Sequence, residues 1–217
     1  MINRALSILI LVTSVISHAA SPRLVESESQ GKRVTSVFLG DKKHGTETHY
    51  FEDGAIAIQL QFINGSQQGK EIHFYPNGQR RAVIEFKDGL KHGDMFNWYP
   101  DGKFLGLAKF NEGHHDEISQ AWHPNGQPRA LAFFADGFQQ GDEIQYYPNG
   151  RKKLVGKFKD GKLHGMERQW YESGGIRSEI VYRDGEMTND QKFWDEKGEF
   201  LEGVDLEAFR QRPQFDH

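Results

Sequence analysis

The chain has 217 residues, of which 36% are hydrophobic, 12% aromatic and 27% charged, with a formal net charge of -4. This mildly acidic balance disfavours general nucleic-acid binding, because that affinity comes mostly from neutralised phosphates. Cysteine is absent, which excludes disulfides, thiol catalysis, cysteine-ligated zinc and a lipidated cysteine.

The first 19 residues have the pattern of a secretory signal peptide. Arg4 precedes an apolar run over residues 5–16, and small residues follow up to Ala19. The run is shorter than the roughly 20 residues that a membrane-spanning helix needs, and an uncleaved anchor is the alternative. We therefore predict cleavage after Ala19 and an exported protein, located in the periplasm or outside the cell.

Residues 20–36 read as a polar leader that could end in one strand, and a repeat array follows over residues 37–198. Its period is 24 residues, without any insertion, as expected of stacked units that cannot absorb an added residue. Glycines mark one series, at Gly54, Gly78, Gly102, Gly126, Gly150, Gly174 and Gly198. Aromatic residues mark two more, at Tyr50, Phe74, Trp98, Trp122, Tyr146, Trp170 and Trp194, and at Phe38, Phe62, Phe86, Phe110, Phe134, Phe158 and Tyr182.

Each unit reads as a β-hairpin, with two short segments rich in aromatic and β-branched residues. We predict a tight turn at Pro76-Asn77-Gly78 and its equivalents, because Asn-Gly supplies positive φ. The second connection, over residues 87–93, carries two glycines and is predicted to be looser. The sequence therefore predicts an all-β fold, an elongated single-layer antiparallel sheet of about seven 24-residue hairpins.

Alternation along the strands assigns the faces of this sheet. We expect Phe86 to share a face with Ala82, opposite Arg81. The aromatic row that contains Phe74 and the row that contains Phe86 are expected to form one continuous spine. Such cross-strand aromatic pairs would stabilise a sheet that has no second layer.

The array is followed by a tail over residues 199–217, which we predict to act as a cap. Asp205 is a candidate N-cap for a short helix that ends before Pro213. Such a helix could cover the open edge of the last hairpin.

Several units resemble those of a known family. The stretches are "YPNGQRRAVIEFKDGLKHG", "YPDGKFLGLAKFNEGHHDE", "YPNGRKKLVGKFKDGKLHG" and "YESGGIRSEIVYRDGEMTN". They are similar to bacterial MORN-type repeats, specifically the MORN-repeat-variant group of YwqK-like antitoxins. The resemblance covers about residues 37–198, and it departs at Glu117, where glycine is usual, and at Asp195. It implies an elongated antiparallel sheet with protein-binding or lipid-associated roles.

No residues stand out as catalytic, cofactor-binding or metal-binding. The densest group of metal-ligand types is His114 to Glu117, but equivalent residues of successive units should lie roughly 9.6 Å apart, too far to share one ion. Acidic residues such as Asp88 recur because the turn favours them. No nucleophile, phosphate-loop or dinucleotide motif occurs. We therefore predict a protein that is not an enzyme and needs no cofactor.

A row of basic residues is expected to share one face with a row of tyrosines. Tyr and Arg together are typical of binding surfaces. The alternative is that the arginine stems cover the tyrosine rings as ordinary packing. The candidate binding face consists of Tyr75, Arg81, Tyr99, Arg129, Tyr147, Lys153, Tyr171 and Arg177.

The predicted function is a non-catalytic, exported repeat scaffold that binds a protein partner in the cell envelope. One alternative is an antitoxin or immunity-type protein that neutralises a toxin, which only the family resemblance implies. Another is association with anionic lipid or cell-wall polymer through the basic row.

Overall fold

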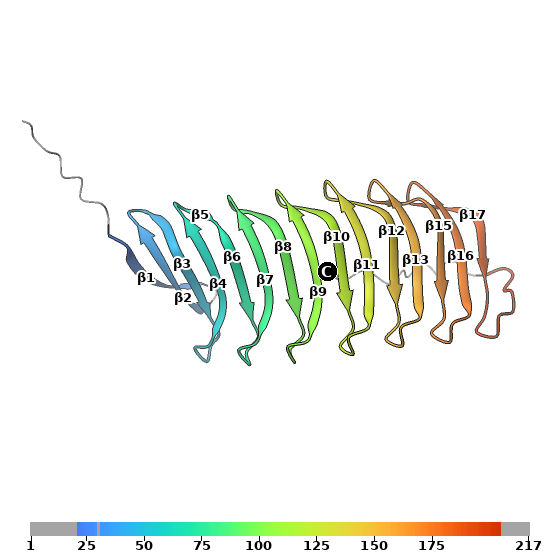
Figure 1. Cartoon of the computed structure of the whole chain (residues 1–217), viewed down its shortest axis with the longest axis horizontal. Helices are drawn as coiled ribbons and strands as arrows, with labels where there is room; N and C mark the ends of the chain where they lie inside the picture. Colours follow the sequence, from blue (N-terminus) through green and yellow to red (C-terminus); the bar gives the residue numbers. More distant parts are fainter. Residues whose placement is uncertain (1–20, 30, 205–217) are drawn as a thin grey trace, which may run out of the picture.

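The structure is a computed structural model that describes residues 21–29 and 31–204, and these residues form one open antiparallel sheet (Figure 1). Strands that follow one another in the sequence are neighbours in the sheet. The prediction of an all-β, single-layer array is confirmed. The strands are β1 (Arg23–Ser29), β2 (Lys32–Leu39), β3 (Lys42–Tyr50), β4 (Ile56–Ile63), β5 (Ser66–Gln67), β6 (Gly69–Phe74), β7 (Arg80–Lys87), β8 (Leu90–Trp98), β9 (Phe104–Asn111), β10 (His114–Trp122), β11 (Pro128–Ala135), β12 (Phe138–Tyr146), β13 (Lys152–Lys159), β14 (Lys162–Leu163), β15 (Gly165–Trp170), β16 (Ile176–Arg183) and β17 (Glu186–Phe193).

The sheet begins within residues 20–36, which we predicted to be a polar leader. There β1 pairs with β2, from Arg23 opposite Phe38 to Ser29 opposite Lys32. The predicted signal peptide, residues 1–19, and the predicted helix after Asp205 lie outside the described residues. The described part of the chain contains no helix that could cross a membrane.

The two turns of each hairpin are the reverse of what we predicted. Asp88 and Gly89 have φ values of 52° and 82°, as a two-residue type I′ turn requires, and they join β7 directly to β8. The Pro76-Asn77-Gly78 stretch instead lies in a longer loop, which the Tyr75 backbone N–H closes by donating to the Gln79 carbonyl at 2.8 Å. Gly78 has a φ of 81°, but Asn77 does not adopt positive φ, whereas a type I′ turn needs positive φ at both central residues.

The second glycine of that connection belongs to a strand rather than to a turn. Gly93 lies inside β8 with a φ of 80°, where the pairing with β7 shifts between Ile84 and Phe86. Such a bulge needs a left-handed residue. Glu117 occupies the equivalent place in β10 and keeps a φ of 55°, so the backbone bulge persists where glycine is missing.

The two aromatic rows lie on opposite faces, so the prediction of one continuous spine is wrong. Ile84 pairs with Glu71, whereas Ile72 pairs with Val83. Residues that pair across neighbouring strands lie on the same face of a sheet. Ile84 therefore shares a face with Glu71, and Phe86 follows it there. Ile72 shares the opposite face with Val83, and Phe74 follows it on that face. We call the side with Glu71, Ile84 and Phe86 the carboxylate face, and the side with Ile72, Phe74 and the tryptophans the tryptophan face.

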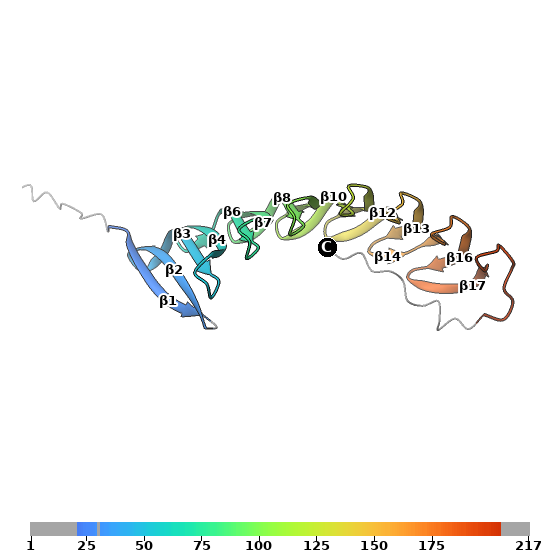
Figure 2. The same ribbon diagram turned by 90° about the horizontal axis from the view of Figure 1, so that it is seen from below.

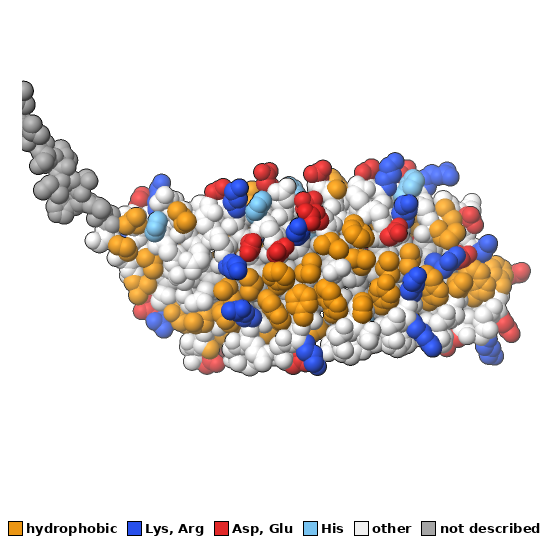
Figure 3. Space-filling view, in the orientation of Figure 1, with side chains coloured by type: hydrophobic (Ala, Val, Ile, Leu, Met, Phe, Trp, Pro, Cys, Tyr) orange, Lys and Arg blue, Asp and Glu red, His pale blue; other side chains and the backbone are white. Residues whose placement is uncertain are grey.

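The tryptophan face carries the larger rings. The Phe104 ring lies between Trp98 and Trp122, with centroid distances of 6.1 and 5.0 Å. The sheet arches along its length, with its middle raised above its ends (Figure 2). The outside of the arch carries a band of hydrophobic side chains that runs along the array (Figure 3), as these rows would produce.

The carboxylate face contains the most deeply buried side chains. Ala132, Leu154 and Glu143 are all 0% exposed, although no second layer covers the sheet. Small residues let the larger neighbours on adjacent strands close over them, in the way that alternating large and small residues fill a core. Most of the buried hydrophobic side chains therefore form a row along the carboxylate face, although Val83 is buried on the other face.

Gly106 illustrates how tightly neighbouring strands approach on this face. A Cβ atom there would lie 2.8 Å from the Gln120 backbone oxygen, whereas one on Gly175 would meet nothing within 4 Å. We expect Gly106→Ala to lower the free energy of unfolding by about 1–2 kcal/mol through steric overlap. The matched variant Gly175→Ala should be neutral or slightly stabilising. Chemical denaturation would check this, and equal effects of the two variants would contradict it.

Candidate functional site

A row of buried or half-buried carboxylates runs along the carboxylate face. Its members share one position of the 24-residue period and are Glu47, Glu71, Glu143 and Glu167. Side chains four residues before and two residues after contact the carboxylates of Glu47, Glu71 and Glu143. At Glu167 the earlier position is Leu163, and Gln169, two residues after, donates at 2.9 Å. Gln139 and Gln145 donate to Glu143 at 2.8 and 2.6 Å. Each of these glutamates therefore lies in a cradle of side chains close to it in the sequence, with both donor positions filled at Glu47, Glu71 and Glu143.

The cradle favours the charged form of the glutamates nearest the N-terminus. Burial opposes ionisation of Glu47, but hydrogen bonds from Lys43, Ser36 and His49 outweigh it and hold its pKa below the ordinary value. At Glu71 burial is likewise outweighed by hydrogen bonds from His73 and Gln67, and the charges of His73 and Lys91 lower the pKa further. These carboxylates are consequently ionised acceptors at neutral pH.

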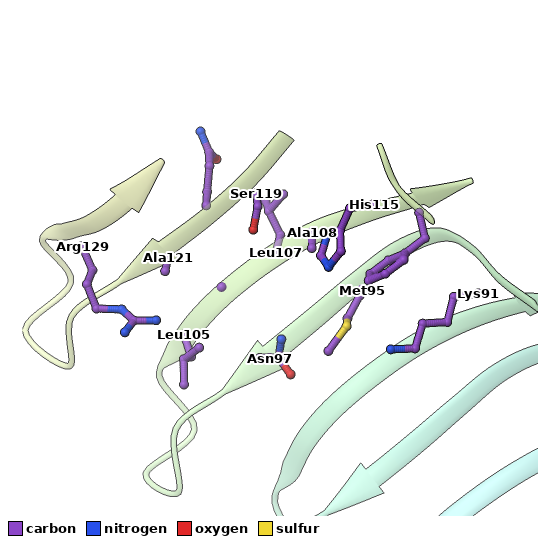
Figure 4. A pocket seen from close by; sticks show the side chains of 13 residues that line it. Lys91, Met95, Asn97, Leu105, Leu107, Ala108, His115, Ser119, Ala121 and Arg129 are labelled. Carbon is purple, nitrogen blue, oxygen red and sulfur yellow. The ribbon is translucent and has the colours of Figure 1, made fainter. Parts of the chain in front are cut away.

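The carboxylate row is interrupted in the middle of the array. Met95 and Ser119 occupy the two positions between Glu71 and Glu143. A hollow of about 190 Å³ opens there, and its lining includes both of these residues, Lys91 and Asn97. Figure 4 shows the Met95 side chain between those of Lys91 and Asn97, with Arg129 at the far end.

A second hollow of about 270 Å³ adjoins the first and shares Met95, Asn97 and Leu105 with it. Tyr75 and Arg81 also line it. The two hollows together form a depression in the carboxylate face, with an arginine near each end. The depression contains no glutamate or aspartate among its lining residues.

Arg81 lies on the carboxylate face, so its predicted placement opposite Ala82 is wrong. His73 pairs with Ala82 and Phe74 with Arg80, which makes Arg81 the extra residue of a β-bulge. The bulge turns its side chain toward His73, whose Nδ1 lies 3.0 Å from the Arg81 Nη2. Simple alternation along the strand fails wherever a bulge adds a residue.

The hydroxyls of the predicted tyrosine row hold neighbouring units together. Tyr75 donates to the Trp98 carbonyl at 2.8 Å, and Tyr99 donates to the Trp122 carbonyl at the same distance. Tyr147 and Tyr171 repeat this bond to the carbonyls of the next unit. These hydroxyls therefore have a structural use, as the packing alternative expects.

The other predicted residues lie away from the hollows. The Lys153 ammonium is 5.8 Å from the centroid of the Tyr147 ring. Burial raises the pKa of Tyr147, while the charge of Arg177 opposes that rise. The structure thus brings Tyr75, Arg81 and Arg129 to the hollows, but not Tyr99, Tyr147, Lys153, Tyr171 or Arg177.

Sequence reasoning missed Lys91, Met95, Asn97 and Ser119. The sequence did contain a signal for this site. Glutamate recurs every 24 residues from Glu47 to Glu167, except at Met95 and Ser119 in the centre of the array, and the next position is Gln191. The sequence prediction found no metal site, and within the described residues no group of three or more candidate ligands lies together. His115 packs instead against Phe110, with ring centroids 4.2 Å apart.

The matches of a protein-family model to this chain follow the 24-residue period. The family model described as MORN repeat variant matches residues 43–64, 67–88 and 163–184. All three matches begin at the same position of the 24-residue period. None covers a residue that lines the first hollow, whereas the match over residues 67–88 includes Tyr75 and Arg81 of the second. No curated protein matches the chain, and the resemblance to YwqK-like antitoxins stays a prediction. The MORN repeat variant is thus found at three repeats of the array, and such repeats are generally protein- or lipid-binding modules that are typically non-enzymatic.

Proposed function

We propose that this chain is a non-catalytic scaffold, exported to the cell envelope, that binds a protein partner on its carboxylate face. The observation that carries the proposal is the central depression, where two adjoining hollows interrupt an otherwise closed row of buried side chains. Concave sites lined by apolar and a few polar groups are the usual places for ligands.

Charge and composition favour this face as the contact surface. Arg81 and Arg129 flank the depression, and Tyr75 forms part of its wall. Arginine and tyrosine contribute disproportionately to protein interfaces, because they combine large contact area with directional hydrogen bonds. The signal-peptide pattern of residues 1–19 supports an envelope location for the partner.

Charge reversal at three arginines tests the proposal. We expect the joint replacement of Arg81, Arg129 and Arg177 by glutamate to abolish capture of partners from the native cell envelope. The control replaces Arg80, Lys103 and Lys152 by glutamate, which makes the same change in net charge at exposed sites. Quantitative mass spectrometry of the captured proteins is the measurement.

Two results would refute the proposal. Partners retained equally by both triple variants would remove the carboxylate face from the interaction. Salt-sensitive sedimentation with anionic vesicles or with peptidoglycan, together with no captured protein, would instead support association with lipid or cell-wall polymer.

A further inference from the structure

The unit that contains β8 keeps both donors of the carboxylate cradle but lacks its acceptor. In β3, Lys43 and His49 flank Glu47 and both contact its carboxylate. In β8, Lys91 and Asn97 occupy the equivalent positions, with Met95 in place of the glutamate. The methionine side chain has no carboxylate oxygen to offer either donor.

Among the described residues, Lys91 does not pair with a different carboxylate instead. Its ammonium lies 4.9 Å from the centroid of the Phe110 ring, and it forms no ion pair with a carboxylate of the described residues. It acts on Glu71 only through its charge, which helps to lower the pKa of that residue. Lys91 is half-buried and lines the hollow, where a charge gains more from an opposite charge than it would in water.

The hollow has the size and polarity for an acidic side chain. Its volume of about 190 Å³ exceeds the roughly 30 Å³ that one water molecule occupies in the liquid. Lys91 and Asn97 lie on one side of it, Arg129 at the other end and the apolar Met95 and Leu105 between them (Figure 4). Positive and amide donors around an apolar floor suit a carboxylate attached to a short aliphatic stem.

We propose that this hollow accepts a glutamate or aspartate side chain from an acidic segment of the protein partner. The partner's carboxylate would take the place that Glu47, Glu71, Glu143 and Glu167 fill elsewhere in the array. This inference rests on the proposed function, since it names the chemistry that the carboxylate face recognises.

The test uses a fluorescent peptide of alternating glutamate and glycine, and a counterpart in which glutamine replaces every glutamate. The full chain is expected to bind the glutamate peptide at least roughly tenfold more tightly than the glutamine peptide, from loss of a charge-assisted hydrogen bond. Met95→Glu supplies an internal carboxylate to Lys91 and is expected to block the hollow, with a comparable loss of binding. Lys91→Met should weaken binding similarly, whereas the exposed control Lys87→Met should leave it unchanged.

Three outcomes would overturn the inference: equal affinity for the two peptides, unchanged binding by a folded Met95→Glu variant, or Lys91-dependent binding to phosphatidylglycerol vesicles but not to the peptide. Circular dichroism establishes that each variant is folded. If the peptide fails while envelope capture still depends on the three arginines, the inference fails and the proposed function stands. If the peptide binds while capture is insensitive to those arginines, the proposed function fails instead.

Discussion

Replacing Leu154 by alanine is expected to lower the free energy of unfolding by about 2–5 kcal/mol. Leu154 is completely buried, and it pairs with Gln145 on one side and Gln169 on the other. Both neighbours are themselves buried and fixed by hydrogen bonds to the glutamates of their own strands. The site therefore cannot collapse easily around the lost methyl groups, and a cavity should remain.

The matched control is Leu90→Ala at the turn edge of β8. Leu90 is 49% exposed, so its truncation should change the free energy of unfolding by less than about 1 kcal/mol. Urea denaturation followed by tryptophan fluorescence would compare the two variants. Because neighbouring units of a repeat array can unfold separately, amide hydrogen exchange in β12 to β15 should show where the loss is felt. Equal losses for both leucines would contradict a core that lies mostly on the carboxylate face.

Glu143→Met is expected to lower the free energy of unfolding by about 1–3 kcal/mol, because it removes a buried acceptor while its donors remain. Glu143 is 0% exposed and accepts hydrogen bonds from Gln139 and Gln145. Gln145 is buried as well, so water cannot readily replace the lost acceptor. The substitution places at position 143 the residue that the chain already has at the equivalent position of the repeat, Met95.

Thermal and urea unfolding of Glu143→Met would be compared with Glu172→Met, which makes the same chemical change at an exposed position. The exposed variant should shift the free energy of unfolding by no more than about 0.5 kcal/mol. A neutral Glu143→Met variant would show that the carboxylate row contributes little to stability, and it would weaken the interpretation of Met95 as a specialised exception.

The repeat architecture could be predicted from the sequence because its determinants are local. Glycines, turn residues and aromatic residues recur at a fixed step, and a single-layer hairpin array satisfies all of them at once. The sequence also predicted correctly that Ile84 and Phe86 share a face, because β7 has no extra residue between them.

The faces of the sheet were harder to predict because each hairpin contains β-bulges. One extra residue at Arg81 was enough to move a candidate binding side chain to the other face. Likewise, Asp88 looked like an ordinary turn residue, although it and Gly89 form the tight turn.

The carboxylate row escaped prediction for a different physical reason. Glutamate is rarely fully buried, so a periodic glutamate reads as a solvated side chain. Glu143 and Glu167 are buried only because glutamines two residues further along their strands donate to them. The glutamines can be recognised as donors only once the structure shows that they share a face with the glutamates. The same is true of the missing glutamate at position 95, which is Met95.

The most direct test of the carboxylate face as the binding surface uses the methyl groups of the chain's four methionines as NMR reporters. Met95 lines the central hollow, whereas Met166, which pairs with Val181 and is half-exposed, lies on the tryptophan face. Titration with the glutamate peptide is expected to shift the Met95 methyl resonance and leave Met166 in place. A shift of Met166 without one of Met95 would contradict the account.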